Sequence, residues 1–274
     1  MVNLDFNFSK GFLKVSSRVL STVAFGQSDV GKKRARNEDH YCILEKERLF
    51  VVADGMGGHA GGETASRIAV STIAAVIRSN SQVLSDTNKY SGDLENSPVA
   101  KLLSDALRSA CQEIFREGSK NISLQGMGTT ATGLLLHNNE AFIGHVGDSR
   151  AYLMRAGRLL QLSEDHSLVN EQLKAGLITS EQAQQSRFRN IITRSIGFED
   201  DVDVDMIALK VLPEDTFLLC TDGLTTLVTD PEISDILANN YLYDVPQLLI
   251  NLANSRGGDD NITIVIVHAD QEQK

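Results

Sequence analysis

The sequence has few cysteines, and they are poorly placed for a disulfide framework or a structural zinc site. Cys42, Cys111 and Cys220 are odd in number, lie far apart and form no CxxC pair. Disulfide-rich domains and zinc modules depend on paired, closely spaced cysteines. We therefore expect a protein of a reducing compartment and predict a cytoplasmic location.

Long apolar runs are also missing. No stretch approaches the roughly 20 apolar residues of a membrane helix, so we expect no transmembrane segment. Residues 1–22 contain Asp5 and lack a continuous apolar block, which is not typical of a secretory signal. We interpret them as an N-terminal extension, flexible or packed at an edge. Their mild amphipathic character leaves docking on a partner or a membrane surface open.

Positive charge is the minority charge. The 274 residues include 26 Lys and Arg against 36 Asp and Glu, a formal net charge of −10. Because a polyanion needs a basic footprint, this balance argues against nucleic acid as the main partner. A phosphorylated substrate stays compatible, since the local charge of a site can oppose the net sign.

Apolar runs rich in β-branched and aromatic residues predict strands at 49–53, 130–136, 141–146, 217–220 and 262–267. Apolar spacing predicts helices over 63–78 and 99–115. The polar segment 165–196 indicates two short helices joined at Gly176, and the polar stretch 80–98 indicates a surface loop. Strands outnumber helices and come in hairpin-like groups. This favours a single α+β domain with antiparallel sheets.

Acidic residues recur at the ends of these predicted strands. They are Glu38, Asp39, Asp54, Asp148, Asp222, Asp259 and Asp260. One Asp-Gly pair is typical of a turn, but several strand ends can meet at one rim of a sheet. The carboxylates would then repel one another unless cations neutralise them. Oxygen ligands favour hard cations, so the pattern predicts a magnesium or manganese site.

Arg34 lies close to these acids, in the segment KKRARNED. A basic run of this kind is usually a solvated surface. A guanidinium beside a metal-bound carboxylate cluster, however, can hold a phosphate in a two-pronged grip that lysine cannot form. The position next to Glu38 and Asp39 favours this second interpretation.

Eight segments follow one another in a distinctive order: RARNED (34–39), VVADGMGGHAGGE (51–63), GMGTTAT (126–132), HVGDSRAYLMRAG (145–157), LSEDHSLV (162–169), NIITRSIG (190–197), LLCTDGL (218–224) and GGDDNITIV (257–265). Together they resemble the protein phosphatase 2C family, the metal-dependent serine/threonine phosphatases, and specifically its bacterial branch. One such motif is weak evidence, but eight in the family's order and spacing are highly specific. The resemblance covers about residues 23 to 267.

The resemblance implies a four-layer αββα fold, in which a sandwich of two antiparallel sheets is flanked by antiparallel helix pairs. It implies a phosphatase domain over 23–268 with a flap at 165–196, and a tail at 269–274. It also implies two Mn²⁺ or Mg²⁺ ions and a third, weaker ion. In this scheme Asp54 bridges two metals, the Gly55 carbonyl binds one, and Asp222 and Asp260 complete the other. The resemblance further implies that Glu38 and Asp39 bind the metals through water and that Asp148 is a ligand of the third ion. It implies that Arg34 binds the substrate phosphate.

The general acid is left open. The family's animal members often carry a histidine second after the first metal aspartate, but Met56 stands there, as is usual in bacterial members. His59 is one candidate for protonating the leaving group, and water is the other. The resemblance implies hydrolysis of phosphoserine and phosphothreonine in proteins by metal-activated water, without a phosphoenzyme. A serine/threonine kinase is the expected opposing partner, and we expect a monomer.

The sequence also allows three alternative interpretations. Cys42 and Arg48 have the C-x5-R spacing of a cysteine-dependent phosphatase, but Glu45 and Glu47 in between would repel a phosphate. The run from Gly55 to Ala60 superficially matches the glycine-rich fingerprint of a dinucleotide-binding domain. That fingerprint also needs a second strand that ends in an acidic residue about 20 residues later, and none follows here. The third alternative is a non-catalytic phosphoprotein-binding or regulatory protein on the same fold.

Overall fold

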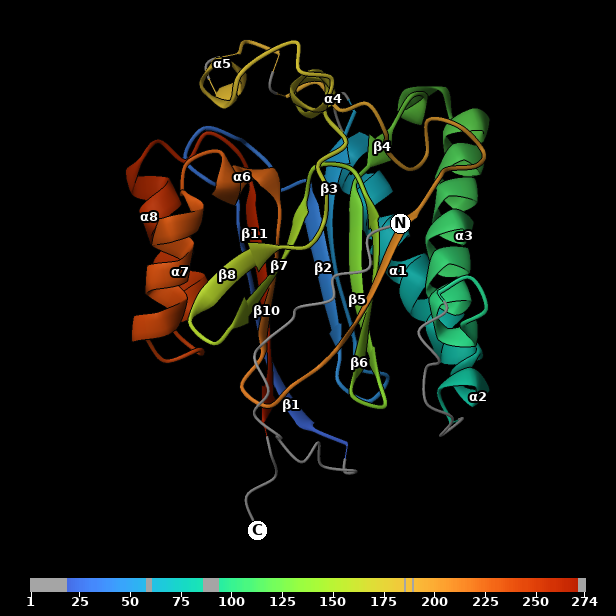
Figure 1. Ribbon diagram of the computed structural model, residues 1–274. Helices are drawn as coiled ribbons and strands as arrows, with labels where there is room; N and C mark the ends of the chain where they lie inside the picture. Colours follow the sequence, from blue (N-terminus) through green and yellow to red (C-terminus); the bar gives the residue numbers. More distant parts are fainter. Residues whose placement is uncertain (1–18, 58–60, 86–93, 185, 189, 271–274) are drawn as a thin grey trace.

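The computed structural model describes residues 19–57, 61–85, 94–184, 186–188 and 190–270. In this part of the chain, two antiparallel sheets pack face to face and helices cover both outer faces (Figure 1). The prediction of an α+β sandwich with four layers is confirmed.

The first sheet has the strand order β1-β11-β10-β7-β8. Its strands are β1 (Ser21–Asp29), β7 (Arg150–Arg155), β8 (Arg158–Gln161), β10 (Thr216–Cys220) and β11 (Ile262–Asp270). The second sheet has the order β2-β3-β5-β6-β9, with the short β4 paired to β3. Its strands are β2 (Asp39–Leu44), β3 (Leu49–Met56), β4 (Gly128–Thr129), β5 (Ala131–His137), β6 (Glu140–Val146) and β9 (Asp205–Lys210).

The central strands β3 and β10 are apolar over most of their length because both of their faces are buried. In β3, Phe50 and Val52 pack between the two sheets, whereas Val51 packs toward the helices. In β10, Phe217 lies between the sheets and Leu218 faces the helices on the other side. The two-residue period of a strand therefore divides one apolar run between two layers of core.

Each sheet carries its own pair of long helices (Figure 1). Helices α1 (Gly61–Ser79) and α3 (Pro98–Lys120) cover the second sheet, and α7 (Asp230–Asn239) and α8 (Val245–Ser255) cover the first. Helix α3 begins where Ser97 caps it, since Ser97 Oγ accepts a hydrogen bond from Ala100 N–H and Pro98 occupies the first turn. Short helical turns complete the set: α2 (Ser81–Leu84), η1 (Ile122–Leu124) and α6 (Asp222–Thr225).

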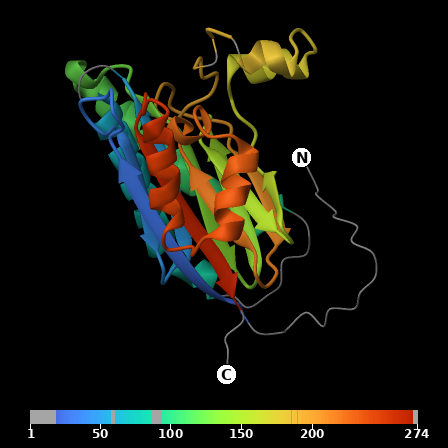
Figure 2. The ribbon, with the colours of Figure 1, turned by 90° about the vertical axis from the view of Figure 1, so that its left-hand side faces the viewer.

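The segment 165–196 rises above one end of the sandwich (Figures 1 and 2). It contains α4 (Leu168–Lys174) and α5 (Ser180–Gln184), and Gly176 between them adopts φ +68°. A positive φ at this position suits glycine. The prediction of two short helices joined at Gly176 is confirmed.

Other predictions need correction. The stretch 80–98 is not simply a loop, because it holds α2 and the first residue of α3. Strand β3 continues past Asp54 to Met56, so Asp54 lies within the strand. Strands β1, β2, β4, β8 and β9 and helices α7 and α8 have no counterpart among the predicted elements. The expected domain limits at 23 and 268 fall inside β1 and β11, residues 1–18 lie outside the described part, and the domain division stays a prediction.

Substitution of Leu103 tests how closely α3 packs against the second sheet. Its side chain is fully buried, and a Cβ added to Gly144 of β6 would lie 3.2 Å from Leu103 Cγ, which shows how closely the helix approaches. We expect Leu103→Ala to lower the free energy of unfolding by about 2–5 kcal/mol, since it leaves a cavity. Leu177→Ala, at a position 72% exposed, is the matched control. Equal denaturation midpoints in urea for the two variants would contradict this packing.

Candidate metal centre

Five aspartates far apart in the chain meet at one end of the sandwich. In the second sheet, Asp39 opens β2 and is the direct antiparallel partner of Asp54 in β3, and Asp148 follows β6. On the other sheet, Asp222 opens α6 directly after β10, and Asp260 stands just before β11. Each sheet therefore contributes carboxylates to the same rim.

Asp39 links the two sheets. It is 4% exposed, and its Oδ2 atom accepts hydrogen bonds from Thr221 Oγ1 at 2.8 Å and from Thr263 Oγ1 at 2.7 Å. Thr221 follows β10 and Thr263 lies in β11, so both donors come from the opposite sheet. The backbone N–H of Thr263 also donates to Thr221 Oγ1, at 2.9 Å. These bonds hold the facing sheets together at the site.

The backbone at Asp54 is fixed by the adjacent strands. Its N–H donates to Thr130 Oγ1 at 2.9 Å, and its carbonyl accepts from Thr130 N–H at 2.9 Å and from Thr129 Oγ1 at 2.7 Å. A Cβ at the following Gly55 would lie 2.1 Å from the carbonyl oxygen of Gly62. Only glycine fits there, so the Asp-Gly pair is required by the approach of α1.

Burial, and then mutual repulsion, raise the pKa values of the clustered carboxyls. The pKa of Asp39 rises to about 7 and that of Asp148 to about 8, in both cases chiefly by burial. The pKa of Asp54 lies well above its ordinary value, through burial and then the charges of the other aspartates. Burial and the charge of Asp260 likewise raise the pKa of Asp222. The cluster is therefore short of positive charge.

Three buried carboxylate oxygens of the cluster have no hydrogen-bond partner among the described residues. They are the Oδ1 atoms of Asp39, Asp148 and Asp222. A buried polar atom without a partner is costly. A hard cation, or water bound to one, supplies the missing partner, so these residues fit a divalent-cation site.

Over the described ranges, no group of three His, Cys, Asp or Glu side chains is arranged to hold a metal ion by itself. Magnesium usually keeps several waters and binds proteins through one or two carboxylates. A site of this kind depends on shared carboxylates and water rather than on a closed cage of side chains.

A cavity of about 420 Å³ opens beside the cluster. Its lining residues are Arg34, Glu38, Asp54, Gly55, Met56, Gly57, Asp148, Asn190, Ile192, Asp222, Asp260 and Asn261. Arg34 reaches it from the loop before β2, and its Nη2 lies 2.6 Å from Asp260 Oδ2. Arg34 is thus the only lysine or arginine among the described residues that line this cavity.

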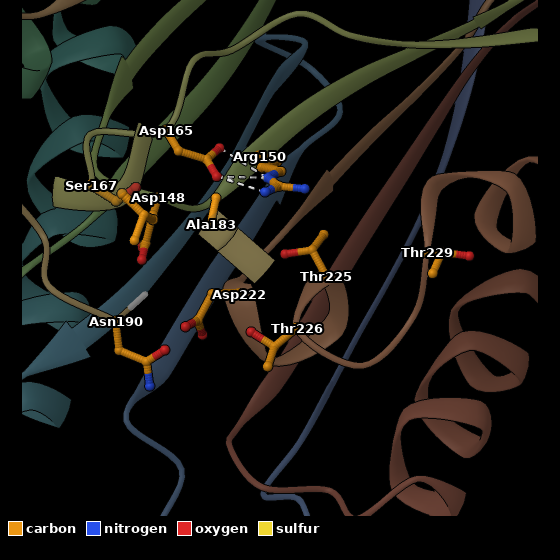
Figure 3. Close-up of a pocket in the computed structure, with 11 residues that line it drawn as sticks. Asp148, Arg150, Asp165, Ser167, Ala183, Asn190, Asp222, Thr225, Thr226 and Thr229 are labelled. Atoms are coloured by element: carbon orange, nitrogen blue, oxygen red, sulfur yellow. Dashed lines mark hydrogen bonds and ion pairs between the residues drawn. The ribbon is translucent and has the colours of Figure 1, made fainter. Parts of the chain in front are cut away.

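A second cavity, of about 390 Å³, adjoins the first (Figure 3). The two share Asp148, Asp222 and Asn190, and the first two point into the same space. Behind them, Arg150 grips Asp165 with bonds of 2.9 Å from Nε to Oδ1 and 2.6 Å from Nη2 to Oδ2. Asn190 comes from segment 165–196, so this segment forms part of the roof.

The structure brings most of the predicted site residues together. Those that line the first cavity are Arg34, Glu38, Asp54, Gly55, Asp148, Asp222 and Asp260. Asp39 is not a lining residue and lies buried behind them, where Thr221 and Thr263 hold it. His59 lies outside the described residues, so its role remains a prediction.

Sequence reasoning missed the residues that position the site. Thr221 directly precedes the predicted ligand Asp222 in the segment TDG, and Thr263 follows the predicted ligand Asp260 by three residues in the segment DNIT; this proximity in sequence was the available signal. His166 has no comparable signal. Its Nδ1 accepts from Gly147 N–H at 3.0 Å, and its own N–H donates to the carbonyl of Gly147 at 2.8 Å, which ties segment 165–196 to the residue before Asp148.

The two enzyme alternatives are not supported. Burial raises the pKa of the Cys42 thiol to about 12, so the reactive thiolate is disfavoured at neutral pH. No cysteine occurs among the described residues that line either cavity beside the aspartates. The dinucleotide interpretation is excluded because Asp54 and Gly55 belong to an antiparallel sheet, rather than to the parallel βαβ unit that the fingerprint needs.

Comparison with known proteins gives a consistent result. The model of a family described as protein phosphatase 2C matches residues 27–248. A serine/threonine phosphatase stp of Listeria monocytogenes is 38% identical over 256 residues, which cover 90% of this chain and 96% of that protein. The protein phosphatase PhpP of Streptococcus pneumoniae is 36% identical over 253 residues, covering 89% and 96%.

Solved structures agree. The serine/threonine phosphatase PstP/Ppp of Mycobacterium tuberculosis superposes with a TM-score of 0.81 at 32% identity, covering 91% of this chain and 99% of that one. The catalytic domain of a PstP in complex with two manganese ions gives a TM-score of 0.79 at 33% identity, covering 92% and 100%.

The raised pKa values make the stability of the cation-free protein depend on pH. Because Asp39 and Asp148 have folded-state pKa values of about 7 and about 8 against an ordinary 3.8, the folded state binds more protons than the unfolded state. Stability, measured by thermal unfolding in a chelator, should therefore fall as the pH rises from about 4 to about 8.

The variant Asp148→Asn isolates this effect, because the amide resembles the protonated acid. We expect a flatter pH dependence and, at pH 8, a gain of about 1 kcal/mol or more, which corresponds to about 2–4 °C in Tm for a chain of this size. Asp201→Asn, whose parent side chain is 64% exposed, is the control. A Tm that rises with pH over this window would show that the cluster is not strained by its own charge.

Proposed function

Since the chain belongs to the protein phosphatase 2C family and is a serine/threonine phosphatase, we propose that it hydrolyses phosphoserine and phosphothreonine in proteins with divalent cations held by the aspartate cluster. The observation that carries this proposal is the convergence of buried carboxylates from both sheets, with three unpartnered oxygens, on a cavity that also holds Arg34.

The donor set suits two hard cations. Asp54 and the Gly55 carbonyl, together with Asp222 and Asp260, would hold them directly, and Glu38 and Asp39 would act through water. Asp148 and Asp222, which face one space (Figure 3), would hold a third and weaker ion. The related structure with two manganese ions supports Mn²⁺, and the all-oxygen ligands also suit Mg²⁺.

When bound, such cations would supply electrophilic stabilisation of the phosphoryl group and a water that ionises near neutral pH. The role of Arg34 follows from its position. It is half exposed at the mouth of the cavity, and its fork now contacts Asp260. Turned toward a phosphate, it can donate two parallel hydrogen bonds to the phosphoryl oxygens and align the ester.

Attack by water without a phosphoenzyme is supported by what lines the cavity. Among its described lining residues there is no Cys, Ser or His, and the aspartates there, which can also act as nucleophiles, would be taken up as ligands of the cations. For the same reason the leaving group takes its proton from water or from His59, which lies outside the described residues.

The proposed partners are phosphorylated proteins and an opposing serine/threonine kinase. A protein substrate is consistent with the open setting of the cavity, whose rim includes Asn190 and Ile192 of segment 165–196. Within the described residues, no helix has the length and apolarity to cross a membrane. A cytoplasmic location and a monomeric state remain predictions.

Adjacent aspartates offer a matched test of the metal ligands. Asp260 lines the cavity, whereas Asp259 is paired with Lys33 on the surface, 2.6 Å away. We expect Asp260→Asn, Asp54→Asn and Asp222→Asn each to lower turnover of a phosphopeptide by about a hundredfold or more, since even loss of an outer-shell partner costs roughly 10–100-fold. Asp259→Asn should stay near wild type.

Chelation completes that test. EDTA should abolish turnover and added Mn²⁺ or Mg²⁺ should restore it, with circular dichroism used to confirm that each variant is folded. Full activity of Asp260→Asn, or activity that survives EDTA, would refute the metal-dependent mechanism. A folded protein that binds the phosphopeptide and Mn²⁺ without turnover would instead support the non-catalytic alternative.

Arg34→Lys tests the phosphate grip, because lysine keeps the charge and loses the fork. Hydrogen bonds to charged groups contribute about 1.5–3 kcal/mol, so we expect kcat/KM to fall by about tenfold or more. Arg36→Lys, at an exposed neighbouring position, is the control. An unchanged kcat/KM for Arg34→Lys, measured under saturating Mn²⁺, would remove Arg34 from the proposed site.

A further inference from the structure

Segment 165–196 leaves the sandwich and returns to it through two short legs (Figure 1). The incoming leg is residues 166–168, and the outgoing leg is residues 191–196. Ser167 pairs with Ile192 in an antiparallel bridge, with a backbone hydrogen bond of 2.9 Å on either side of it. The two legs therefore form one unit at the base of the segment.

The incoming leg is attached to the sandwich through His166, which is 7% exposed. Its N–H donates to the carbonyl of Gly147 at 2.8 Å, and its Nδ1 lies 3.0 Å from the Gly147 N–H. Because a backbone N–H can only donate, Nδ1 is the acceptor and the proton of the neutral ring sits on Nε2. Gly147 directly precedes Asp148, so this tautomer of His166 fixes the backbone beside a proposed metal ligand.

The outgoing leg is attached at its far end. Ile196 and Thr129 exchange two backbone hydrogen bonds, of 2.9 and 3.0 Å. The hydroxyl of Thr129 donates to the carbonyl of Asp54 at 2.7 Å. Each leg is thus anchored next to backbone that carries a proposed metal ligand.

Asp205, the first residue of β9, joins the two legs through side chains. Its Oδ2 lies 3.0 Å from His166 Nε2, and its Oδ1 accepts from Arg194 Nη1 at 2.6 Å. Arg194 Nη1 also lies 3.1 Å from His166 Nε2. In the tautomer that Gly147 requires, both of these nitrogens are donors. They can lie this close together because one carboxylate accepts a hydrogen bond from each of them.

An amide cannot replace this carboxylate. In Asp205→Asn one oxygen still accepts, but the other acceptor becomes an N–H₂ donor. If the amide oxygen accepts from Arg194, the N–H₂ group faces the Nε2–H of His166. If the amide is turned round, the N–H₂ group faces the guanidinium. In either orientation one leg loses its side-chain bond to β9.

The outgoing leg also forms a wall shared by two cavities. A third cavity, of about 610 Å³, adjoins the aspartate cavity and has Met56, Asn190 and Ile192 in common with it. Its lining continues along the leg through residues 193–195. A peptide whose phosphate is bound at the aspartate cluster would extend along this wall, whereas a small aryl phosphate would end within the first cavity.

We propose that Asp205 is a positioning residue for peptide substrates. By accepting from His166 and Arg194 at once, it fixes both legs and holds the shared wall in place beside the phosphate site. Asp205 lines none of the three cavities around this wall, so it acts through the legs and not by touching a substrate. This role rests on the proposed function, because it assumes a phosphate bound at the aspartate cluster.

Kinetics with two substrates test this role. We expect Asp205→Asn to lower kcat/KM for a phosphopeptide by about tenfold or more, through KM, because a small misplacement of a positioning group is costly. With saturating Mn²⁺, its kcat/KM for a small aryl phosphate should stay near that of the wild-type protein. Asp203→Asn, at a position 90% exposed, is the matched control and should leave both values unchanged.

The ring proton of His166 gives a readout that needs neither turnover nor a change at position 205. Burial lowers the pKa of this ring, which favours the neutral form at neutral pH. Nitrogen-resolved NMR of the histidine side chains in the wild-type protein should show the proton on Nε2. The variant His166→Asn lacks the ring and so assigns the signal.

Three results would overturn the proposal. The first is an unchanged KM for the phosphopeptide in Asp205→Asn. The second is an equal loss for the phosphopeptide and the aryl phosphate, which would indicate a general role in folding or chemistry. The third is a His166 ring with its proton on Nδ1, and this result decides the question if Asp205→Asn does not fold. A wild-type protein that hydrolyses neither substrate would instead refute the proposed function itself.

Discussion

The repulsion among five clustered aspartates, of which Asp39 and Asp148 are buried and the other three are partly buried, is the constraint on which the rest of this structure depends. A folded chain does not gather such groups without compensation, because their charges raise the pKa values of their neighbours, and three of them, Asp39, Asp148 and Asp222, have a buried oxygen without a partner among the described residues. The fold holds them in place through rigid strands and two buried hydroxyl groups. The site has an excess of negative charge, and a bound cation would neutralise it.

The two-sheet architecture explains how the carboxylates come so close. Asp39 and Asp54 face each other through the register of β2 and β3, whereas Asp222 and Asp260 depend on where β10 ends and β11 begins. Neither sheet holds the full set. The packing of Phe50, Phe217 and Val265 between the two sheets therefore sets the distance between the two groups of carboxylates, although none of the three lines the site.

The sequence predicted the central features because their signals are local and strong. The runs 49–53 and 217–220 are apolar throughout, and an Asp-Gly pair follows the first directly and the second after Thr221, so strand and predicted ligand could be recognised together. Strand β9 could not be found in this way, since DMIALK shows no two-residue alternation of apolar and polar residues and no Asp-Gly pair follows it. The support that Thr221 and Thr263 give to Asp39 is a contact between residues about 180 and 220 positions away from it, and such contacts depend on how the sheets pack.

All of the site carboxylates lie at one end of the sandwich, and the turns at its other end carry none of the chemistry. The connection between β2 and β3 and the tight hairpin at Asn138 and Asn139 belong to that far end. Insertions, fused domains or lineage-specific decorations placed at the β2–β3 turn would leave the reacting groups undisturbed. The fold thus separates a region where substitution is tightly restricted from one where evolution, or an engineer, can lengthen the chain at little cost.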